Sequence, residues 1–430
     1  VFVKLRLKVK LNLSIIIIIL YKERSEGKSM NFRKVLKGGM VAAMAMSLVA
    51  CSSNSSANGN GSAAGGSSTS TDAFKLGGSG PISGDAAVYG LAVQHGAELA
   101  VKEINAEGKV KLDFNFQDDQ ADAEKAVTAF NTLADWGMQV SIGTTTSGAG
   151  QAVSSSYQQE DIFAITPSGS SPAIIYQDSD NEANPYGNVF QMCFSDPNQG
   201  VASADYITEH KVGTKVGIIY RNDDNYSTGI TNKFKKEAEA KGLDVVTEQG
   251  FANGTTDYSV YVQKCKDAGA DVVFLPIYYQ PASQILAEAK KQGYEPTFFG
   301  CDGMDGILDM EGFDASLAEG LYMLTPFSAD AEDEKTQNFV KAYKEAYGDT
   351  PIQFAADAYD AVYAIAQALE ESGVKASDST SDITAALVKE FTSMKFNGLT
   401  GSDVTWNENG EVSKEPKAVI ITNGAYVSAE

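Results

Sequence analysis

The chain is poor in the residues that most often carry catalysis and metal binding. Its 430 residues include two histidines, four cysteines and two tryptophans. Two histidines leave few options for acid–base or metal chemistry. His95 lies in the middle of a predicted helix, and His210 lies near the end of another, where the helix dipole favours a cation. We expect both to be structural, and we expect no catalytic residue, no metal site, no cofactor and no enzymatic activity.

Cysteines are too few and too widely spaced for a disulfide framework. Apart from Cys51, which belongs to the leader discussed below, the chain has Cys193, Cys265 and Cys301. An odd number of cysteines at wide spacing does not form a framework even in an exported protein. We expect all three to be buried as small apolar side chains.

Basic residues are scarce outside the first 50 positions. The chain has 34 Lys and Arg against 56 Asp and Glu, a formal net charge of −22. Residues 1–50 hold 10 of the basic and 2 of the acidic residues, which leaves 24 basic and 54 acidic residues for the rest. Because phosphate binding needs a basic surface, this composition excludes nucleic acid as a partner.

The apolar runs near the beginning of the chain are too short to form a helix that crosses a membrane. Met30 opens the basic stretch MNFRKVLKGG, which is followed by the apolar MVAAMAMSLVA and then by Cys51. This order predicts a secretory signal peptide over residues 30–50. Since that signal is complete by itself, we interpret residues 1–29 as an upstream extension from a misplaced start.

The sequence LVAC at residues 48–51 resembles a bacterial lipobox, in which the cysteine is acylated and becomes the mature N-terminus. Acyl chains on Cys51 would anchor the protein to a membrane surface without spanning it. Residues 51–72 are rich in Ser, Gly and Asn and predict a flexible tether. We therefore expect an exported protein, lipid-anchored to the extracytoplasmic face of a bacterial membrane, whose folded part begins near Ala73.

Strand-like and helix-like segments alternate along the folded part in two series, over residues 74–196 and 215–303. Their apolar strand segments suit sheets that are covered on both faces, which means parallel sheets in α/β domains. Two such series predict two similar lobes.

Long helices are predicted after the second series, which suggests that the chain returns to the first lobe. They are expected near residues 334–347, 353–372 and 381–394. The end of the chain is β-like, with turn signals at Asn409–Gly410 and Asn423–Gly424. We assign residues 73–193 and 327–405 to an N-terminal lobe, and residues 194–326 and 406–430 to a C-terminal lobe.

The loops after the predicted strands are rich in Ser, Thr, Tyr, Gly and acids. In open parallel sheets, ligands bind at the carboxyl ends of the strands. Hydroxyls and backbone N–H groups can hold a carboxylate, and an acid opposite them can hold an ammonium. Together these groups fit a zwitterion. The loops are GSGPISGDAAVYG, GTTTSGAG, TPSGSSPA, RNDDNYSTG, PIYYQPAS and GCDGMDG.

Three other kinds of site fit the sequence poorly. Residues 78–84 (GSGPISG) approach a dinucleotide fingerprint, but the third glycine comes one residue late and Pro81 lacks an N–H group. No G-x-S-x-G motif accompanies either histidine, as a Ser–His–Asp site would need. The acidic loops at 178–188 and 221–229 lack the spacing of a calcium loop and are interpreted as solvated turns.

From about Phe74 to its end, the chain resembles the type I periplasmic binding proteins, specifically the branched-chain amino-acid (Leu/Ile/Val) receptors of ABC transporters. The resemblance implies two Rossmann-like lobes with parallel central sheets, joined by three crossovers and closing on a ligand. The matching pieces occur in the order of the family and are GPISGDAAVYG with GAELAVKEINAEG, QDDQADAEKAV, IGTTTSGAGQAVSSSYQQEDIFAITPSGSSP, YRNDDNYSTG and FLPIYYQPASQILAEAKKQGYEPTFFGCDG.

The same resemblance implies a set of residues that bind the ligand carboxylate and the ligand side chain. Ser147 matches the serine that binds the α-carboxylate, and Ser168 and Ser170 match the loop that contacts carboxylate and ammonium. Ser170 stands where a threonine is usual, which keeps the hydroxyl. Tyr89 and Tyr226 match aromatic contacts from the two lobes.

The remaining implied residues are a tyrosine and an acid. A further family tyrosine corresponds to Tyr278 or Tyr279, and the sequence leaves the choice open. Asp302 takes the place of the carboxylate that pairs with the α-ammonium, with one methylene less than the usual Glu. From the sequence, Asp302 is expected in a flexible glycine-rich loop after a strand.

The implied function is that of a monomeric solute-binding lipoprotein. Its partners would be an amino-acid ligand, most simply a branched-chain or other apolar one, and the permease subunits of an ABC importer. An alternative is a sensor that presents an amino acid, amide or aromatic acid to a signalling partner. The chain departs from the family in lacking the small disulfide of the N-terminal lobe, since no cysteines lie near residues 117–147.

Overall fold

The computed structural model describes residues 72–179, 182–414 and 416–429. All described residues belong to one compact unit. The predicted signal peptide, Cys51 and the tether up to residue 71 lie outside the described residues. Within the part that is described, no helix has both the length and the apolar character that a membrane crossing requires.

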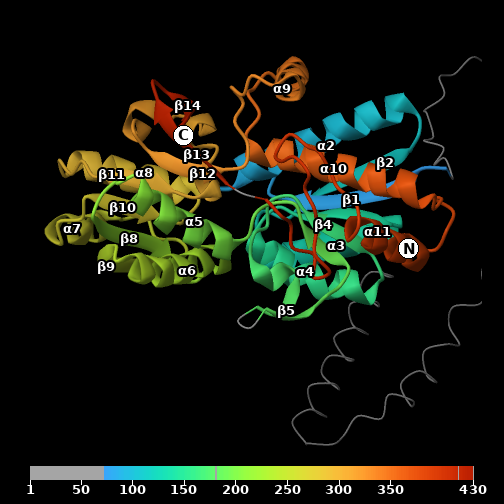
Figure 1. Ribbon diagram of the computed structural model, residues 1–430, viewed down its shortest axis with the longest axis horizontal. Helices are drawn as coiled ribbons and strands as arrows, with labels where there is room; N and C mark the ends of the chain where they lie inside the picture. Colours follow the sequence, from blue (N-terminus) through green and yellow to red (C-terminus); the bar gives the residue numbers. More distant parts are fainter. Residues whose placement is uncertain (1–71, 180–181, 415, 430) are drawn as a thin grey trace, which may run out of the picture. The chain divides into compact units, whose positions relative to one another are not determined.

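A first sheet has five strands in the order β2–β1–β3–β4–β7, and neighbouring strands are parallel. Figure 1 shows α2 and α10 on one face of this sheet and α3 and α4 on the other. The strands are β1 (Phe74–Gly80), β2 (Leu112–Asp118), β3 (Val140–Thr144), β4 (Phe163–Thr166) and β7 (Val189–Gln191). This sheet and the helices that pack around it are called the first half below, and the second sheet with its helices is called the second half. The helices of the first half are α2 (Ala87–Glu107), α3 (Ala123–Trp136), α4 (Ser147–Gln159), α9 (Glu334–Tyr347), α10 (Gln353–Ser372) and α11 (Thr380–Phe391).

A second sheet has seven strands in the order β14–β13–β12–β11–β10–β8–β9. The five strands β9, β8, β10, β11 and β12 are parallel to one another. Strand β13 pairs antiparallel with β12, and β14 pairs antiparallel with β13. The strands are β8 (Lys215–Arg221), β9 (Asp244–Phe251), β10 (Val272–Leu275), β11 (Thr297–Gly300), β12 (Tyr322–Thr325), β13 (Lys417–Thr422) and β14 (Ala425–Ser428). The helices are α5 (Asp196–Glu209), α6 (Asn225–Lys241), α7 (Ser259–Asp267) and α8 (Tyr279–Lys291).

Short elements complete the described part, and the sequence analysis did not predict them. One is a small hairpin of two antiparallel strands, and the others are single turns of 3₁₀ helix. They are β5 (Tyr176–Asp178), β6 (Ala183–Pro185), η1 (Pro172–Ile174), η2 (Asp302–Met304), η3 (Ile307–Asp309) and η4 (Ala315–Ala318).

Local signals explain where several helices begin and end. The side chain of Asp122 accepts a hydrogen bond from the Lys125 N–H at the start of α3, as preferred N-cap residues do. Gly242 ends α6 with a φ of 72°, a left-handed conformation that glycine adopts without strain. Near the C-terminus of the chain, Asn423 and Gly424 both have positive φ, 53° and 73°. This geometry is typical of the two-residue hairpin turn predicted between β13 and β14.

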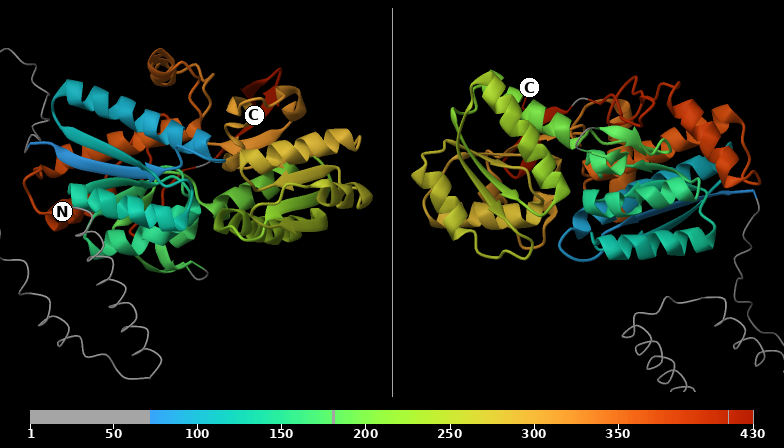
Figure 2. Two further views of the ribbon diagram at one scale, coloured as in Figure 1. Left: turned by 180° about the vertical axis from the view of Figure 1, so that it is seen from behind. Right: turned by 90° about the horizontal axis from the view of Figure 1, so that it is seen from below.

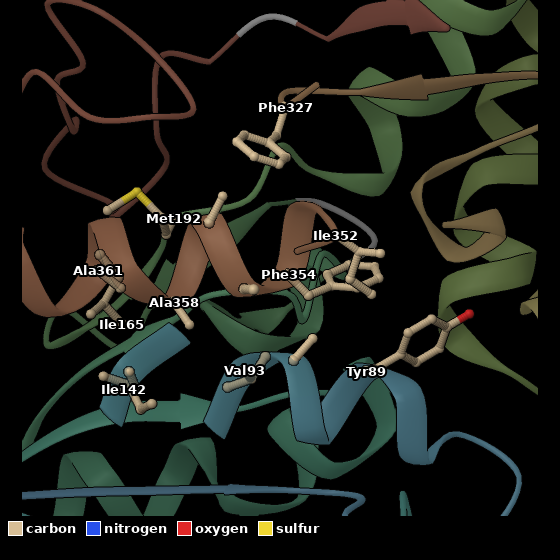
Figure 3. Packing of buried hydrophobic residues seen from close by; sticks show 14 of the residues in the cluster. Tyr89, Val93, Ile142, Ile165, Met192, Phe327, Ile352, Phe354, Ala358 and Ala361 are labelled. Atoms are coloured by element: carbon tan, nitrogen blue, oxygen red, sulfur yellow. The ribbon is translucent and has the colours of Figure 1, made fainter. Parts of the chain in front are cut away.

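The packing of α10 against α2 confirms that the chain returns to the first half after the second sheet. The two helices lie side by side (Figures 1 and 2). A Cβ atom at Gly96 of α2 would lie 2.1 Å from the carbonyl oxygen of Ala355 in α10, so the close approach requires glycine. Figure 3 shows the apolar side chains between these helices and the sheet, with the Tyr89 hydroxyl pointing away from Val93 and the core.

The chain passes between the two sheets three times. The passages lie after β7, after β12 and before β13. Trp406 Nε1 donates to the Gln191 carbonyl oxygen at 2.7 Å, and the Gln191 N–H donates to Gly410 O at 3.0 Å. Residues 406–410 therefore still contact β7 of the first sheet. The residue ranges of the lobes remain a prediction. Because of these contacts, we propose that the last boundary lies after Lys414 and not after residue 405.

The cysteines and histidines lie where the sequence predicts them. The three cysteines in the described part, Cys193, Cys265 and Cys301, are buried and free. His95 lies within α2 and stacks on Tyr347, with ring centroids 3.9 Å apart. His210 caps the C-terminus of α5.

Candidate functional site

A narrow cavity lies where the carboxyl ends of strands from both sheets meet. It has room for about one water molecule. Seven of the eight residues predicted to bind a ligand line it, and Tyr279 does not. The lining residues are Tyr89, Thr145, Thr146, Ser147, Ser168, Ser170, Tyr226, Tyr278, Asp302, Gly303 and Phe354.

Hydroxyl groups from the first half form one wall. Thr146 is the N-cap residue of α4 and Ser147 its first residue, so the positive end of the helix dipole points toward this wall. Thr146 Oγ1 is buried and has no hydrogen-bond partner among the described residues, whereas the Ser170 hydroxyl lies beside the buried Asp196 carboxyl group. Buried hydroxyls are nearly always paired, so Thr146 is suited to donate to an acceptor that a ligand brings.

Asp302 forms the opposite wall, and its surroundings correct one expectation from the sequence. It does not lie in a flexible loop: it begins η2 and is 2% exposed. The Tyr226 hydroxyl donates to Asp302 Oδ1 at 2.7 Å and accepts from the Gly303 N–H at 2.9 Å. The 3₁₀ turn and these bonds hold the carboxylate in a defined position.

The electrostatic environment of Asp302 suits a cationic partner. Burial raises the pKa of its carboxyl group from 3.8 to about 7. Hydrogen bonds from Tyr226 and the Gly303 backbone favour the ionised form, and the negative charge of Asp357 opposes it. A cation placed beside Asp302 would favour ionisation and compensate for the loss of water.

Aromatic rings line the space between the two walls. Tyr89 of α2 meets Tyr278 and Phe354 edge to face, with centroids 5.3 Å and 4.9 Å away. The Tyr89 hydroxyl donates to Gly303 O and accepts from the Tyr279 N–H at 3.2 Å. Tyr89 therefore links the first half to two loops of the second, and the rings present apolar surface to the cavity.

The structure distinguishes the two tyrosines that the sequence left open. Tyr278 lines the cavity, whereas Tyr279 is the first residue of α8. The Tyr279 side chain points elsewhere, since its hydroxyl accepts a hydrogen bond from the Val88 N–H at 3.4 Å. The roles of all eight residues toward a ligand remain a prediction.

Four lining residues were missed by the sequence analysis. Thr145, Thr146 and Gly303 are neighbours of predicted residues in the same strand-end loops and could have been included on that ground. Phe354 lies in the first turn of α10, about 50 residues beyond Asp302. Its local sequence resembles that of a core aromatic residue, and only the packing of α10 against α2 brings it to the site.

Taken together, these groups can bind a small zwitterion. Hydroxyls at a helix N-terminus can hold a carboxylate, and Asp302 can hold an ammonium. The rings between them can cover the carbon skeleton. Among the described residues, no group of three or more His, Cys, Asp and Glu side chains is arranged to hold a metal ion.

Residues 73–422 match the family model of the periplasmic binding proteins. The leucine-, isoleucine-, valine-, threonine- and alanine-binding protein of Pseudomonas aeruginosa is 28% identical over 307 residues, 71% of this chain and 80% of that protein. The family model covers the strand-end loops that line the cavity.

Two solved structures are similar in fold and, less closely, in sequence. The branched-chain amino acid transporter substrate binding protein of Streptococcus pneumoniae, in complex with isoleucine, has a TM-score of 0.74 and 26% identity. The similarity covers 83% of this chain and 99% of that one. An ABC transporter substrate-binding protein of Desulfitobacterium hafniense, in complex with Leu, has a TM-score of 0.67 and 26% identity, with 83% and 100% covered.

Proposed function

The chain belongs to the periplasmic binding protein family, and we propose that it captures an α-amino acid between its two lobes and delivers it to an ABC importer without chemical change. The observation that carries this proposal is that one cavity is lined by two groups of opposite preference, which we call its two poles: a carboxylate, which attracts a cation, and hydroxyls at a helix N-terminus, which attract an anion. Asp302 lines the same cavity as Thr146 and Ser147, which lie at the N-terminus of α4. An α-amino acid is the smallest common ligand that satisfies both poles at once.

We propose that the ligand side chain is apolar at the carbons nearest to its Cα atom. Tyr89, Tyr278 and Phe354 would contact these carbons. The names of the similar proteins mention leucine, isoleucine, valine, threonine and alanine as ligands. Leucine, isoleucine and valine are therefore the first candidates.

Capture requires the two lobes to move. The cavity has room for about one water molecule, which is too little for an amino acid. We propose that the ligand enters when the lobes separate by hinge motion at the three passages, and that closure then removes water from both charged poles. The Tyr89 bonds to Gly303 and Tyr279 would form only on closure.

Isothermal titration calorimetry with the twenty common L-amino acids tests the proposed function. We expect saturable binding with a stoichiometry of one for at least one apolar amino acid. Its des-amino analogue and its α-amide should bind at least tenfold more weakly, because each lacks one of the two charges. If no amino acid in the panel binds, the proposal of an amino-acid ligand is wrong.

We also propose that Cys51 carries a lipid anchor that holds the protein at the extracytoplasmic face of a membrane. The lipobox-like LVAC at residues 48–51 supports this proposal. Replacement Cys51→Ala should release the protein from the membrane fraction or leave its leader uncleaved, as judged by fractionation and mass spectrometry. Cys265→Ala, at a buried cysteine in α7, is the control and should fractionate like wild type. Normal cleavage and normal membrane retention of the Cys51 variant would contradict the anchor.

A further inference from the structure

A second, larger cavity adjoins the narrow one described above. It has a volume of about 480 Å³, and it shares Thr146 and Tyr278 with the narrow cavity. The two cavities are therefore neighbours at Thr146 and Tyr278, and a ligand side chain that passes Tyr278 would enter the larger one. We call this larger space the outer chamber.

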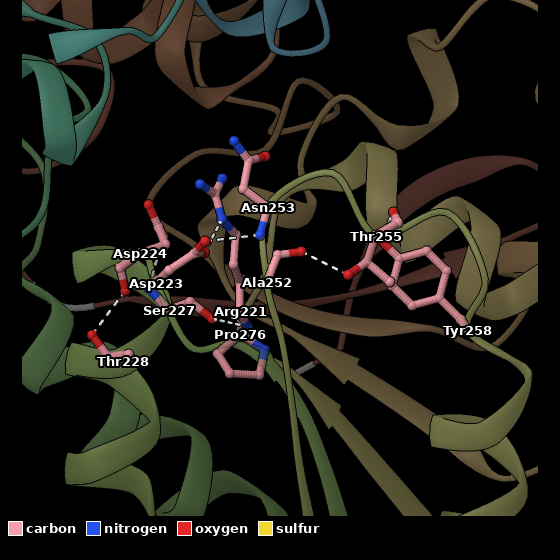
Figure 4. A network of polar contacts seen from close by, with 10 residues as sticks. All are labelled: Arg221, Asp223, Asp224, Ser227, Thr228, Ala252, Asn253, Thr255, Tyr258 and Pro276. Carbon is pink, nitrogen blue, oxygen red and sulfur yellow. Dashed lines mark hydrogen bonds and ion pairs between the residues drawn. The ribbon is translucent and has the colours of Figure 1, made fainter.

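The outer chamber is lined on its second-half side by a fixed polar wall. Asp223 Oδ1 accepts from Arg221 Nε at 2.7 Å, and Asp223 Oδ2 accepts from the Asn253 N–H at 2.9 Å. Figure 4 shows the Arg221 guanidinium and the Asn253 side-chain amide pointing in the same direction, away from the strands below them. One carboxylate therefore holds the Arg221 side chain and the Asn253 backbone in place.

The backbone beneath this wall is held equally firmly. The Ser227 hydroxyl donates to Pro276 O at 2.6 Å and accepts from the Arg221 N–H at 2.8 Å. Asp224 caps α6 by accepting from the Ser227 N–H at 3.1 Å. A wall that is organised before the ligand arrives loses less conformational entropy on binding.

The charges of the outer chamber disfavour an anionic end group. Its lining contains one cation, Arg221, which is already paired, and three acids, Asp85, Asp223 and Asp224. An anionic end group would meet the three carboxylates. A neutral amide offers an oxygen to Arg221 and Asn253 and N–H groups to the nearby carboxylates.

We propose that the site also accepts amino acids whose side chain is longer than that of leucine and ends in an amide, with the amide in the outer chamber against Arg221 and Asn253. This inference rests on the proposed function, because the α-amino and α-carboxylate groups must still bind in the narrow cavity. It extends the substrate class beyond the branched-chain amino acids.

Calorimetry with L-glutamine, L-glutamate, L-norleucine and L-leucine tests the inference, using wild type, Arg221→Met, Asn253→Ala and the control Lys241→Met. Lys241 pairs with Asp205 at 2.7 Å and does not line either cavity. Glutamine should bind wild type saturably and at least tenfold more tightly than glutamate. Arg221→Met and Asn253→Ala should each weaken glutamine about tenfold and change leucine and norleucine less than twofold.

The outcomes separate this inference from the proposed function. Unchanged leucine affinity shows that a variant is folded and that the narrow cavity is intact. If leucine binds and glutamine does not, or if neither variant weakens glutamine more than Lys241→Met does, the outer chamber is not a ligand site and the inference is wrong. If none of the four amino acids binds wild type, this inference is wrong, and the titration with the twenty common amino acids decides separately whether the proposed function fails.

Discussion

Replacement of Asp302 by alanine is expected to weaken binding of the cognate amino acid by two to three orders of magnitude or more. In the closed site the ligand ammonium would be buried without its partner, and breaking a buried charge pair costs about 3–5 kcal/mol. This corresponds to roughly 200- to 4,000-fold in affinity. Calorimetry with the amino acid and its des-amino analogue is the decisive measurement, because the variant should lose most of the preference for the amino acid that wild type shows.

Asp305→Asn provides a matched control for Asp302→Ala. Asp305 is also a buried acid, 4% exposed, and lies three residues further on. Its carboxylate accepts from the Gln353 and Gly306 N–H groups at 2.9 Å and 3.0 Å, and it does not line the cavity. This variant should keep the preference for the amino acid. If Asp302→Ala also keeps both affinity and preference, Asp302 does not pair with an ammonium.

Asp302→Asn separates the role of Asp302 in binding from its role in stability. Burial raises the pKa of Asp302 from 3.8 to about 7, so the folded protein binds more protons than the unfolded chain between these pH values. Ionisation therefore destabilises unliganded wild type increasingly as pH rises from about 4 to about 7, by at most about 4 kcal/mol. The Asn variant should bind weakly and yet unfold at higher urea concentration than wild type at pH 8, with the difference vanishing near pH 4. A lower midpoint at pH 8 would contradict this account.

Replacement of Lys414 by methionine is expected to lower the free energy of unfolding by about 3–5 kcal/mol. Lys414 Nζ lies 2.7 Å from Asp357 Oδ1, and both side chains are 1% exposed. It also donates to Thr400 Oγ1 at 2.6 Å. Without Lys414, the carboxylate of Asp357 would stay buried with no cation. Because Lys414 precedes β13 and Asp357 lies in α10, the pair ties the third passage between the sheets to the first half.

Urea unfolding followed by circular dichroism measures this loss, and two further variants control it. Lys395→Met removes a cation whose pair with Asp403 is exposed, at 67% and 70%, and should change stability by no more than about 0.5 kcal/mol. The double variant Lys414→Met with Asp357→Leu should be more stable than Lys414→Met alone, since it leaves no unpaired charge. A Lys414→Met midpoint equal to that of Lys395→Met would mean that the buried pair does not stabilise the fold.

The local sequence was sufficient to predict most of the secondary structure. Residues 334–347 and 353–372 were predicted as helices, and α9 and α10 have these bounds. Glycines with positive φ, Gly348 and Gly373, end both helices, and such stops act within a few residues. The α/β class followed from the alternation of apolar strands and amphipathic helices, which is likewise a local property. The strand-end loops were predicted to form the site because parallel strands bring their carboxyl ends to one edge.

Only the tertiary structure decided which side chains face the cavity and which charges are buried. Tyr278 and Tyr279 are neighbours in sequence, but α8 begins at Tyr279 and turns its ring toward α2, so only Tyr278 lines the site. Phe354 reaches the cavity because Gly96 lets α10 approach α2 closely. The burial of Asp302, and of Lys414 with Asp357, depends on segments 51 to 103 residues away in sequence. Short-range patterns determine helices, strands and their ends, whereas burial, and with it the pKa of a carboxyl group, depends on every segment that excludes water from it.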